Sequence, residues 1–131
     1  MDTALKKLKE EAERVQKMAY APYSKFNVGA ALLSSDGNIY SGCNVENGSF
    51  GLTVCAERNA IFEMVKNGGK SIKRLVVIGE TEKPLSPCGA CRQVIAEFGD
   101  SSTEIYMFNQ KRDYQVVSLN ELIPYVFQFN K

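Results

Sequence analysis

Three cysteines and one glutamate have the residue types and the spacing of a catalytic metal site. Cys55 and Glu57 stand two residues apart in Thr-Val-Cys-Ala-Glu-Arg-Asn-Ala. Cys88 and Cys91 form a C-x-x-C pair in Ser-Pro-Cys-Gly-Ala-Cys-Arg-Gln. Three thiolates fill three of the four tetrahedral positions of Zn²⁺ and leave one for water, which separates a catalytic zinc site from a structural one. A carboxylate beside that water, as Glu57 would be, can take up its proton and pass it to a substrate.

Two further residues bear on the charge and the closure of such a site. Three thiolates on Zn²⁺ leave a net charge of −1, which makes a bound water a weaker acid. A guanidinium from Arg58, hydrogen-bonded to the sulfurs, would withdraw that charge; a solvent-facing helical arginine is the alternative. Cys43 could close the site into a structural four-cysteine centre. Because it lies inside a predicted strand, we expect a buried core cysteine instead.

Each of these features alone also has an ordinary structural explanation. A buried cysteine is more often a small hydrophobic residue than a ligand, and a glutamate in the first turn of a helix often serves only the helix dipole. The chain contains no histidine, which excludes Ser-His-Asp and Cys-His catalysis and any imidazole metal ligand. The combination of the motifs is far more specific than any one of them, and it favours zinc.

Length and composition predict a single domain spanning residues 1–131, since 44% hydrophobic content is enough for one core. Sixteen basic and fifteen acidic residues give a net charge of +1 without runs of like charge, so neither a nucleic-acid nor a membrane partner is indicated. The charged N-terminal residues predict neither a signal peptide nor a membrane span. We expect a cytoplasmic protein, whose four cysteines serve metal binding or catalysis rather than disulfides.

Periodicity and turn signals place the thiols at the starts of two helices. The first predicted element is a helix over 2–19, with apolar positions Leu5, Leu8, Ala12, Val15 and Met18 (with Ala19). Strands over 26–33 and 38–44, joined by Ser-Ser-Asp-Gly, follow it, and a loop over 45–53 leads to a helix over 55–67 that two glycines end. The remaining predicted elements are a buried strand over 74–79, a helix over 88–98, strands over 104–108 and 114–117, and a helix that begins with a capping box at Ser118. This order predicts an α/β sandwich with a mixed sheet whose central strand is 74–79.

On this arrangement, Cys55 and Cys88 each stand at a loop-to-helix junction, with one central strand between them in the chain. The partial positive charge of the two helix N-termini would lower the pKa of each thiol and favour the thiolate that a metal needs. Cys91, one turn after Cys88, would face the same way.

The wider sequence resembles a known family of zinc enzymes. Cys-Ala-Glu with Pro-Cys-Gly-Ala-Cys is similar to the nucleoside and nucleobase deaminases. Segments 21–32 (Ala-Pro-Tyr-Ser-Lys-Phe-Asn-Val-Gly-Ala-Ala-Leu), 42–47 (Gly-Cys-Asn-Val-Glu-Asn) and 86–93 resemble the cytidine deaminases in their short, three-cysteine, homotetrameric form. The resemblance implies a three-layer α/β/α fold with a five-stranded sheet and one Zn²⁺ per chain. It also implies active sites that neighbouring subunits complete.

The same resemblance implies roles for individual residues. Cys55, Cys88 and Cys91 match the zinc ligands, Glu57 the proton shuttle and Arg58 the arginine that neutralises the thiolates. The implied substrate-binding residues are Asn44 and Glu46 on the ribose 3′-hydroxyl, Phe26 against the pyrimidine, the backbone around Ala56 and Ser86 on the base edge, and Phe127 reaching across from another subunit, with Tyr125 or Phe129 as alternatives.

The implied reaction is hydrolytic deamination of cytidine and 2′-deoxycytidine to uridine and 2′-deoxyuridine with release of ammonia, a step of pyrimidine salvage. Four alternatives stay open. Blasticidin S deaminase shares the metal motifs, but the Asn44–Glu46 pair favours an ordinary nucleoside as substrate. A deoxycytidylate deaminase would need a phosphate site. A nucleic-acid editing deaminase would need a cationic groove, which the near-neutral charge does not favour. A zinc-stabilised binding module would use Cys43 as its fourth ligand.

Overall fold

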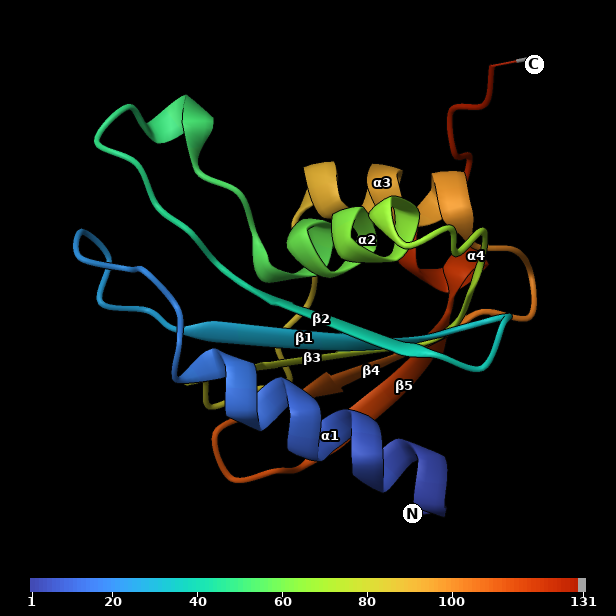
Figure 1. Ribbon diagram of the computed structural model, residues 1–131, viewed down its shortest axis with the longest axis horizontal. Coiled ribbons are helices and arrows are strands. Elements are labelled where there is room, and N and C mark those ends of the chain that lie inside the picture. Colours follow the sequence, from blue (N-terminus) through green and yellow to red (C-terminus); the bar gives the residue numbers. More distant parts are fainter. Residues whose placement is uncertain (130–131) are drawn as a thin grey trace.

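A mixed five-stranded sheet in the order β2-β1-β3-β4-β5 forms the middle layer of the protein (Figure 1). The computed structural model describes residues 1–129. The strands are β1 (Val28–Ser34), β2 (Ile39–Cys43), β3 (Ile72–Gly79), β4 (Glu104–Phe108) and β5 (Tyr114–Ser118). β3 and β4 pair in parallel, and the other neighbours are antiparallel. The predicted mixed sheet and its central strand are both confirmed.

Helices cover both faces of the sheet. They are α1 (Thr3–Gln16), α2 (Ala56–Lys66), α3 (Gly89–Phe98) and the short α4 (Leu119–Leu122). Figure 1 shows α1 on one face and the other three helices on the opposite face, which is the implied three-layer α/β/α arrangement. None of the helices in residues 1–129 is long and apolar enough to cross a lipid bilayer.

The central strand β3 is buried on both of its faces, which explains its nearly continuous apolar sequence. Val76 and Ile78 pack with Leu8 of α1 in one hydrophobic cluster. Leu75 and Val77 point to the opposite face and belong to the larger cluster under α2. Successive side chains of a strand alternate between the two faces, so one short run supplies both cores.

The structure requires glycine at two positions, one in the turn of the β1–β2 hairpin and one where α2 packs on the sheet. Gly37 has φ 89° in the turn between β1 and β2, where Ser34 N–H donates to the Asn38 carbonyl at 2.9 Å. The predicted Ser-Ser-Asp-Gly turn is therefore confirmed. A Cβ at Gly42 would lie 2.5 Å from Ala60 N, so only glycine lets α2 pack directly on β2 at this point.

Three local expectations were wrong. α1 ends at Gln16, so Met18 lies beyond the helix and is 70% exposed rather than a core residue. Cys43 ends the edge strand β2 and is half-buried, because no further strand covers it. Strand β1 starts at Val28 rather than at residue 26, since Lys25 has φ 61° and the chain is still turning there.

Candidate active site

The starts of α2 and α3 bring the three predicted thiols together. Cys55 is the residue that precedes the first turn of α2, and Cys88 holds the same position before α3. Both helices begin at the same end of the sheet (Figure 1). The Sγ atoms of Cys55, Cys88 and Cys91 all lie within 4.8 Å of one another, and the first two are 3.8 Å apart. The predicted convergence of two helix N-termini is confirmed.

This cluster fits a zinc ion. Zn–S bonds of about 2.3 Å in a tetrahedral site place two sulfurs roughly 3.8 Å apart, which matches the Cys55–Cys88 separation. Thiolates are also the donors that zinc favours. Cys43 stays outside the group, and its carbonyl instead accepts a 2.8 Å hydrogen bond from the Asn59 side chain. A three-thiol site with a free fourth position therefore describes the cluster better than a closed four-cysteine site.

The pKa values of the Cys55 and Cys91 thiols are shifted in opposite directions. A hydrogen bond from Cys91 lowers the pKa of Cys55 to about 5, and Arg58 and Cys88 contribute in the same direction. The same hydrogen bond, together with burial, raises the pKa of Cys91 well above its ordinary value. Before metal binding, the cluster is thus a thiolate that neighbouring thiols stabilise, and a metal ion would displace their protons.

Arg58 lies against the cluster as its position after Glu57 predicts. Its Nη2 is 3.5 Å from Cys55 Sγ and 3.4 Å from the Thr53 carbonyl oxygen. Among the residues that the structure describes, Arg58 Nε is the one buried side-chain nitrogen or oxygen without a hydrogen-bond partner. A buried donor of this kind calls for an acceptor. A cluster of metal-bound thiolates would supply negative charge beside it.

Glu57 is buried in the first turn of α2, with 4% of its surface exposed. Burial raises the pKa of its carboxyl group to about 7, since removal from water disfavours the charged form. A group with such a pKa can both accept and release a proton near neutral pH, which is the requirement for a general acid–base residue.

A cavity of about 180 Å³ opens at this point and gathers most of the predicted site residues. It is lined by Phe26, Asn44, Cys55, Ala56, Glu57, Ser86 and Cys88, together with Val28, Thr53 and Leu85. The last three were not predicted. Thr53 and Leu85 lie within two residues of predicted site residues, Cys55 and Ser86, and that proximity is the signal that could have identified them. Val28 is two residues from Phe26, where the predicted strand begins.

Asn44 and Glu46, the expected ribose pair, also hold the local backbone. The Asn44 side-chain amide accepts from Val28 N–H and donates to the Phe26 carbonyl, both at 2.8 Å. The Glu46 carboxylate accepts from the N–H groups of Tyr23 and Ser24 at 3.0 and 3.1 Å, and from the Ser24 hydroxyl. Glu46 does not line the cavity that holds Glu57. It lies in an adjoining hollow, and Thr53 lines both.

Phe127 lies away from the cavity of its own chain. Its side chain is 68% exposed, and its carbonyl accepts a 3.1 Å hydrogen bond from Gln93 of α3. The neighbouring aromatics Tyr125 and Phe129 are also exposed. The C-terminal segment extends beyond α3 and α4, at the opposite end from the loop that leads into α2 (Figure 1). None of the three aromatics lines the cavity that contains Glu57.

Comparison with known proteins places this geometry in a family. The model of the cytidine and deoxycytidylate deaminase zinc-binding region matches residues 2–107. The chain belongs to this family. Its zinc-binding region contains the cluster formed by Cys55, Cys88 and Cys91.

Individual members of the family are similar over nearly the whole chain. A cytidine deaminase of Sporosarcina psychrophila is 50% identical over 123 residues, covering 94% of this chain and 90% of the relative. A cytidine deaminase of Halalkalibacterium halodurans is 45% identical, covering 90% of this chain and 89% of its own. The crystal structure of cytidine deaminase from Burkholderia pseudomallei has 44% identity and a TM-score of 0.90, covering 97% of this chain and 100% of that one.

Proposed function

We propose that the protein is a zinc-dependent aminohydrolase that converts cytidine and 2′-deoxycytidine to uridine and 2′-deoxyuridine with release of ammonia, as a cytoplasmic enzyme of pyrimidine salvage. The observation that carries this proposal is a buried glutamate beside a cluster of three thiols, two of which line the same cavity as the glutamate. The similar proteins named above are themselves cytidine deaminases. In this proposal residues 1–131 form one domain that holds one Zn²⁺.

Cys55, Cys88 and Cys91 would hold the metal. When bound there, zinc lowers the pKa of a water molecule at its fourth position and so supplies a nucleophile near neutral pH. Arg58 compensates part of the thiolate charge from its place beside Cys55 Sγ. Its Nε is buried without a hydrogen-bond partner, which supports a role for the guanidinium beside a negatively charged group.

Glu57 moves the protons of the reaction. As a carboxylate it accepts a proton from the attacking water, and it delivers this proton to ring nitrogen N3 as C4 becomes tetrahedral. The Glu57 carboxylate then takes the proton of the new C4 hydroxyl and transfers it to the exocyclic amino group. The C4–N bond breaks, ammonia leaves, and the C4 carbonyl of uridine forms. Burial supports this assignment because a carboxyl group with a pKa of about 7 is effective in both directions.

The substrate would be held by groups around the cavity. The Phe26 ring packs against the pyrimidine, and the backbone around Ala56 and Ser86 binds the base edge. The first N–H groups of a helix have no partner within the helix, so the start of α2 at Ala56 has donors to offer. Asn44 and Glu46 bind the ribose hydroxyl, and their bonds to the backbone keep both side chains in place.

The first test follows the ultraviolet absorbance of purified protein with cytidine, before and after zinc chelation. We expect a zinc-dependent loss of absorbance. Parallel assays with deoxycytidine monophosphate and with blasticidin S separate the related deaminases. Turnover of one of these, without turnover of cytidine, would move the proposal to that substrate. One tightly held zinc per chain and no turnover of any of the three would favour the structural zinc module.

We also propose a homotetramer in which Phe127 completes a site on a neighbouring subunit. The cavity of about 180 Å³ is small for a ligand site, which usually exceeds about 300 Å³, and this supports a wall supplied by another chain. Exposure of Phe127 in the single chain supports the same role.

Mixed assemblies can test the shared site. Glu57→Gln removes the proton shuttle and Phe127→Ala removes the aromatic, so each homogeneous protein should be impaired. Dissociating and reassembling the two variants together should restore activity, because some sites then pair Glu57 of one chain with Phe127 of another. Activity equal to the average of the two variants would contradict sharing. The same experiment with Tyr125→Ala and Phe129→Ala shows which aromatic has the role.

A further inference from the structure

Arg92 directly follows Cys91, the third cysteine of the cluster, and its guanidinium connects two segments that lie far apart in the sequence. It stands in the first part of α3, one residue after Cys91. Its Nε donates to the Pro87 carbonyl at 2.9 Å and its Nη2 to the Ser86 hydroxyl at 2.6 Å. Its Nη1 donates to the Leu122 carbonyl at 2.6 Å. One planar side chain therefore satisfies three acceptors.

Two of these acceptors belong to the loop that presents the metal ligand. Ser86 and Pro87 immediately precede Cys88, and Ser86 and Cys88 both line the cavity. Residues 80–88 between β3 and α3 belong to no helix or strand, and their backbone bonds to β4 and the turn after it, at Thr81 and Leu85, end before Ser86. Bonds from a charged donor are among the stronger ones in proteins, and a fork of several fixes direction as well as distance.

The third acceptor gives the loop a rigid anchor. Leu122 ends α4, and Leu119 and Leu122 are buried in the main core. The start of α4 is fixed by the capping box of Ser118 and Glu121. The last carbonyls of a helix lack intrahelical partners, and a cationic donor there is favourable. Arg92 supplies it, so the loop before α3 is joined to a helix that the core already holds.

We infer that Arg92 is a positioning residue, which fixes the Ser86–Pro87–Cys88 loop so that the Cys88 ligand and the base-binding backbone keep one geometry. It touches neither metal nor substrate in this role. The inference rests on the proposed function for its effect on turnover, but its effect on metal retention depends only on the thiol cluster. Lysine cannot replace the fork, because an ammonium group is a point charge without the planar, multi-donor geometry.

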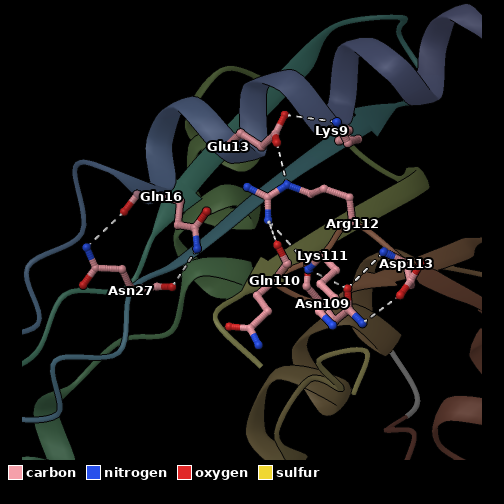
Figure 2. A network of polar contacts seen from close by, with 9 residues as sticks. All are labelled: Lys9, Glu13, Gln16, Asn27, Asn109, Gln110, Lys111, Arg112 and Asp113. Carbon is pink, nitrogen blue, oxygen red and sulfur yellow. Dashed lines mark hydrogen bonds and ion pairs between the residues drawn. The ribbon is translucent and has the colours of Figure 1, made fainter. Parts of the chain in front are cut away.

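A matched control is available on the face of the sheet that α1 covers (Figure 1). Arg112, in the turn between β4 and β5, also bridges two distant segments (Figure 2). Its Nε donates to Glu13 of α1 at 2.6 Å and its Nη1 to the Gln110 carbonyl at 3.1 Å. It lines neither the cavity nor the thiol cluster. Arg112→Gln therefore removes a comparable set of bonds, and none of the lost partners belongs to the cavity or the thiol cluster.

The test compares zinc dissociation from Arg92→Gln, Arg92→Lys and Arg112→Gln, followed with a chromophoric chelator in excess. Groups that orient metal ligands change affinity or activity by about 10- to 100-fold. We expect zinc to leave both Arg92 variants at least tenfold faster than wild type, and Arg112→Gln to match wild type. Dissociation within twofold of wild type in a folded Arg92 variant would overturn the inference. Should Arg92→Gln fail to fold, Arg92→Lys alone decides on the same threshold.

Cytidine kinetics provide a second readout. We expect kcat/KM of both Arg92 variants to fall at least tenfold while Arg112→Gln keeps the wild-type value. Equal losses in the Arg92 and Arg112 variants would mean general destabilisation and would overturn the positioning role. If wild type itself does not deaminate cytidine, the proposed function fails, and the zinc dissociation rates still decide the role of Arg92.

Discussion

Glu57 and Glu13 are both helical glutamates packed near the sheet, yet their surroundings drive their pKa values in opposite directions. For Glu57, burial raises the pKa to about 7. Burial acts on Glu13 in the same sense, but hydrogen bonds from Arg112 and Lys9 outweigh it and lower the pKa (Figure 2). The Glu13 oxygens are 2.6 Å from Arg112 Nε and 3.3 Å from Lys9 Nζ.

The opposite pKa shifts distinguish a glutamate that stabilises the fold, Glu13, from a glutamate that can take part in the reaction, Glu57. A carboxylate paired with two cations is fixed in its charged form and ties α1 to the turn at Arg112. A buried carboxyl group whose pKa lies near neutrality can change its protonation during a reaction. The same residue type therefore serves the fold on the α1 face of the sheet and supplies a proton carrier on the α2 face.

The largest effect should come from removing the proton carrier. Glu57→Gln keeps the shape of the side chain but cannot accept a proton, so we expect turnover of cytidine to fall by about 10³-fold. Zinc content should stay at one per chain. Glu13→Gln is the control, with wild-type turnover and a lower melting temperature. Substantial turnover in Glu57→Gln would contradict the role of Glu57 as the proton carrier, and with it the functional difference between Glu57 and Glu13.

Substitutions of two different cysteines, Cys88 and Cys43, should have opposite outcomes for zinc binding and activity. Cys88→Ala removes a sulfur from the cluster, and we expect both zinc and activity to be lost. Cys43→Ala should retain zinc and activity, because Cys43 lies outside the cluster. Metal content per chain, measured by elemental analysis after dialysis, decides between them. Loss of zinc from Cys43→Ala would instead indicate a four-cysteine structural site.

Arg58→Gln should give an intermediate effect. The substitution removes the positive charge beside Cys55 Sγ and leaves the thiolate charge of the centre uncompensated. We expect kcat/KM to fall about 10- to 100-fold while zinc is retained. Steady-state kinetics with parallel metal analysis measure both. Unchanged kinetics would mean that the guanidinium serves only packing and the Thr53 carbonyl.

Arg112→Gln should affect stability without affecting chemistry. It removes the ion pair with Glu13 and the bond to the Gln110 carbonyl. A loss of about 1 kcal/mol is the usual size for a partly exposed pair, and it corresponds to a melting temperature lower by about 4 °C. Thermal unfolding at neutral pH measures this change. A simultaneous loss of turnover would show that the two faces of the sheet are coupled.

The smallest effect is the pH dependence of that pair. The pKa of Glu13 is lower in the folded protein than the ordinary glutamate value of 4.5. Its contribution to stability is therefore complete above that value and is lost as pH falls through the folded pKa. The melting-temperature difference between wild type and Arg112→Gln should be constant from pH 7 to about pH 5 and shrink below about pH 4.5. A constant difference down to pH 3 would contradict the pairing.

Local sequence signals predicted the elements and the metal cluster well. The apolar run of β3, the turn at Gly37 and the capping box at Ser118 each have a short-range physical cause, and each was confirmed. Cys55 and Cys88 at helix starts follow from the same kind of signal. Their convergence could be predicted because one central strand separates the two helices in the chain.

Features that depend on tertiary contacts were less accessible. The bonds of Glu46 to Tyr23 and Ser24 join residues more than twenty positions apart, and nothing local in the sequence predicts them. The bridge from Arg92 to the Leu122 carbonyl spans thirty positions and was missed for the same reason. The amphipathic pattern of α1 continued to Met18, but the helix ends before it, since periodicity alone does not determine where a helix stops.

Cys55 and Cys88 lie 33 positions apart, and the chain between them contains all of α2 and the central strand β3. A metal ion held by both cysteines closes this segment into a loop. Closing a loop of that length costs an unfolded chain about 3 kcal/mol of conformational entropy. The native fold already brings the two cysteines together, so a metal ion that binds only the native protein does not meet this cost. Its binding favours folding as well as serving the reaction. Chelation should weaken the middle of the sheet, and amide hydrogen exchange in β3 would rise even though no zinc ligand belongs to that strand.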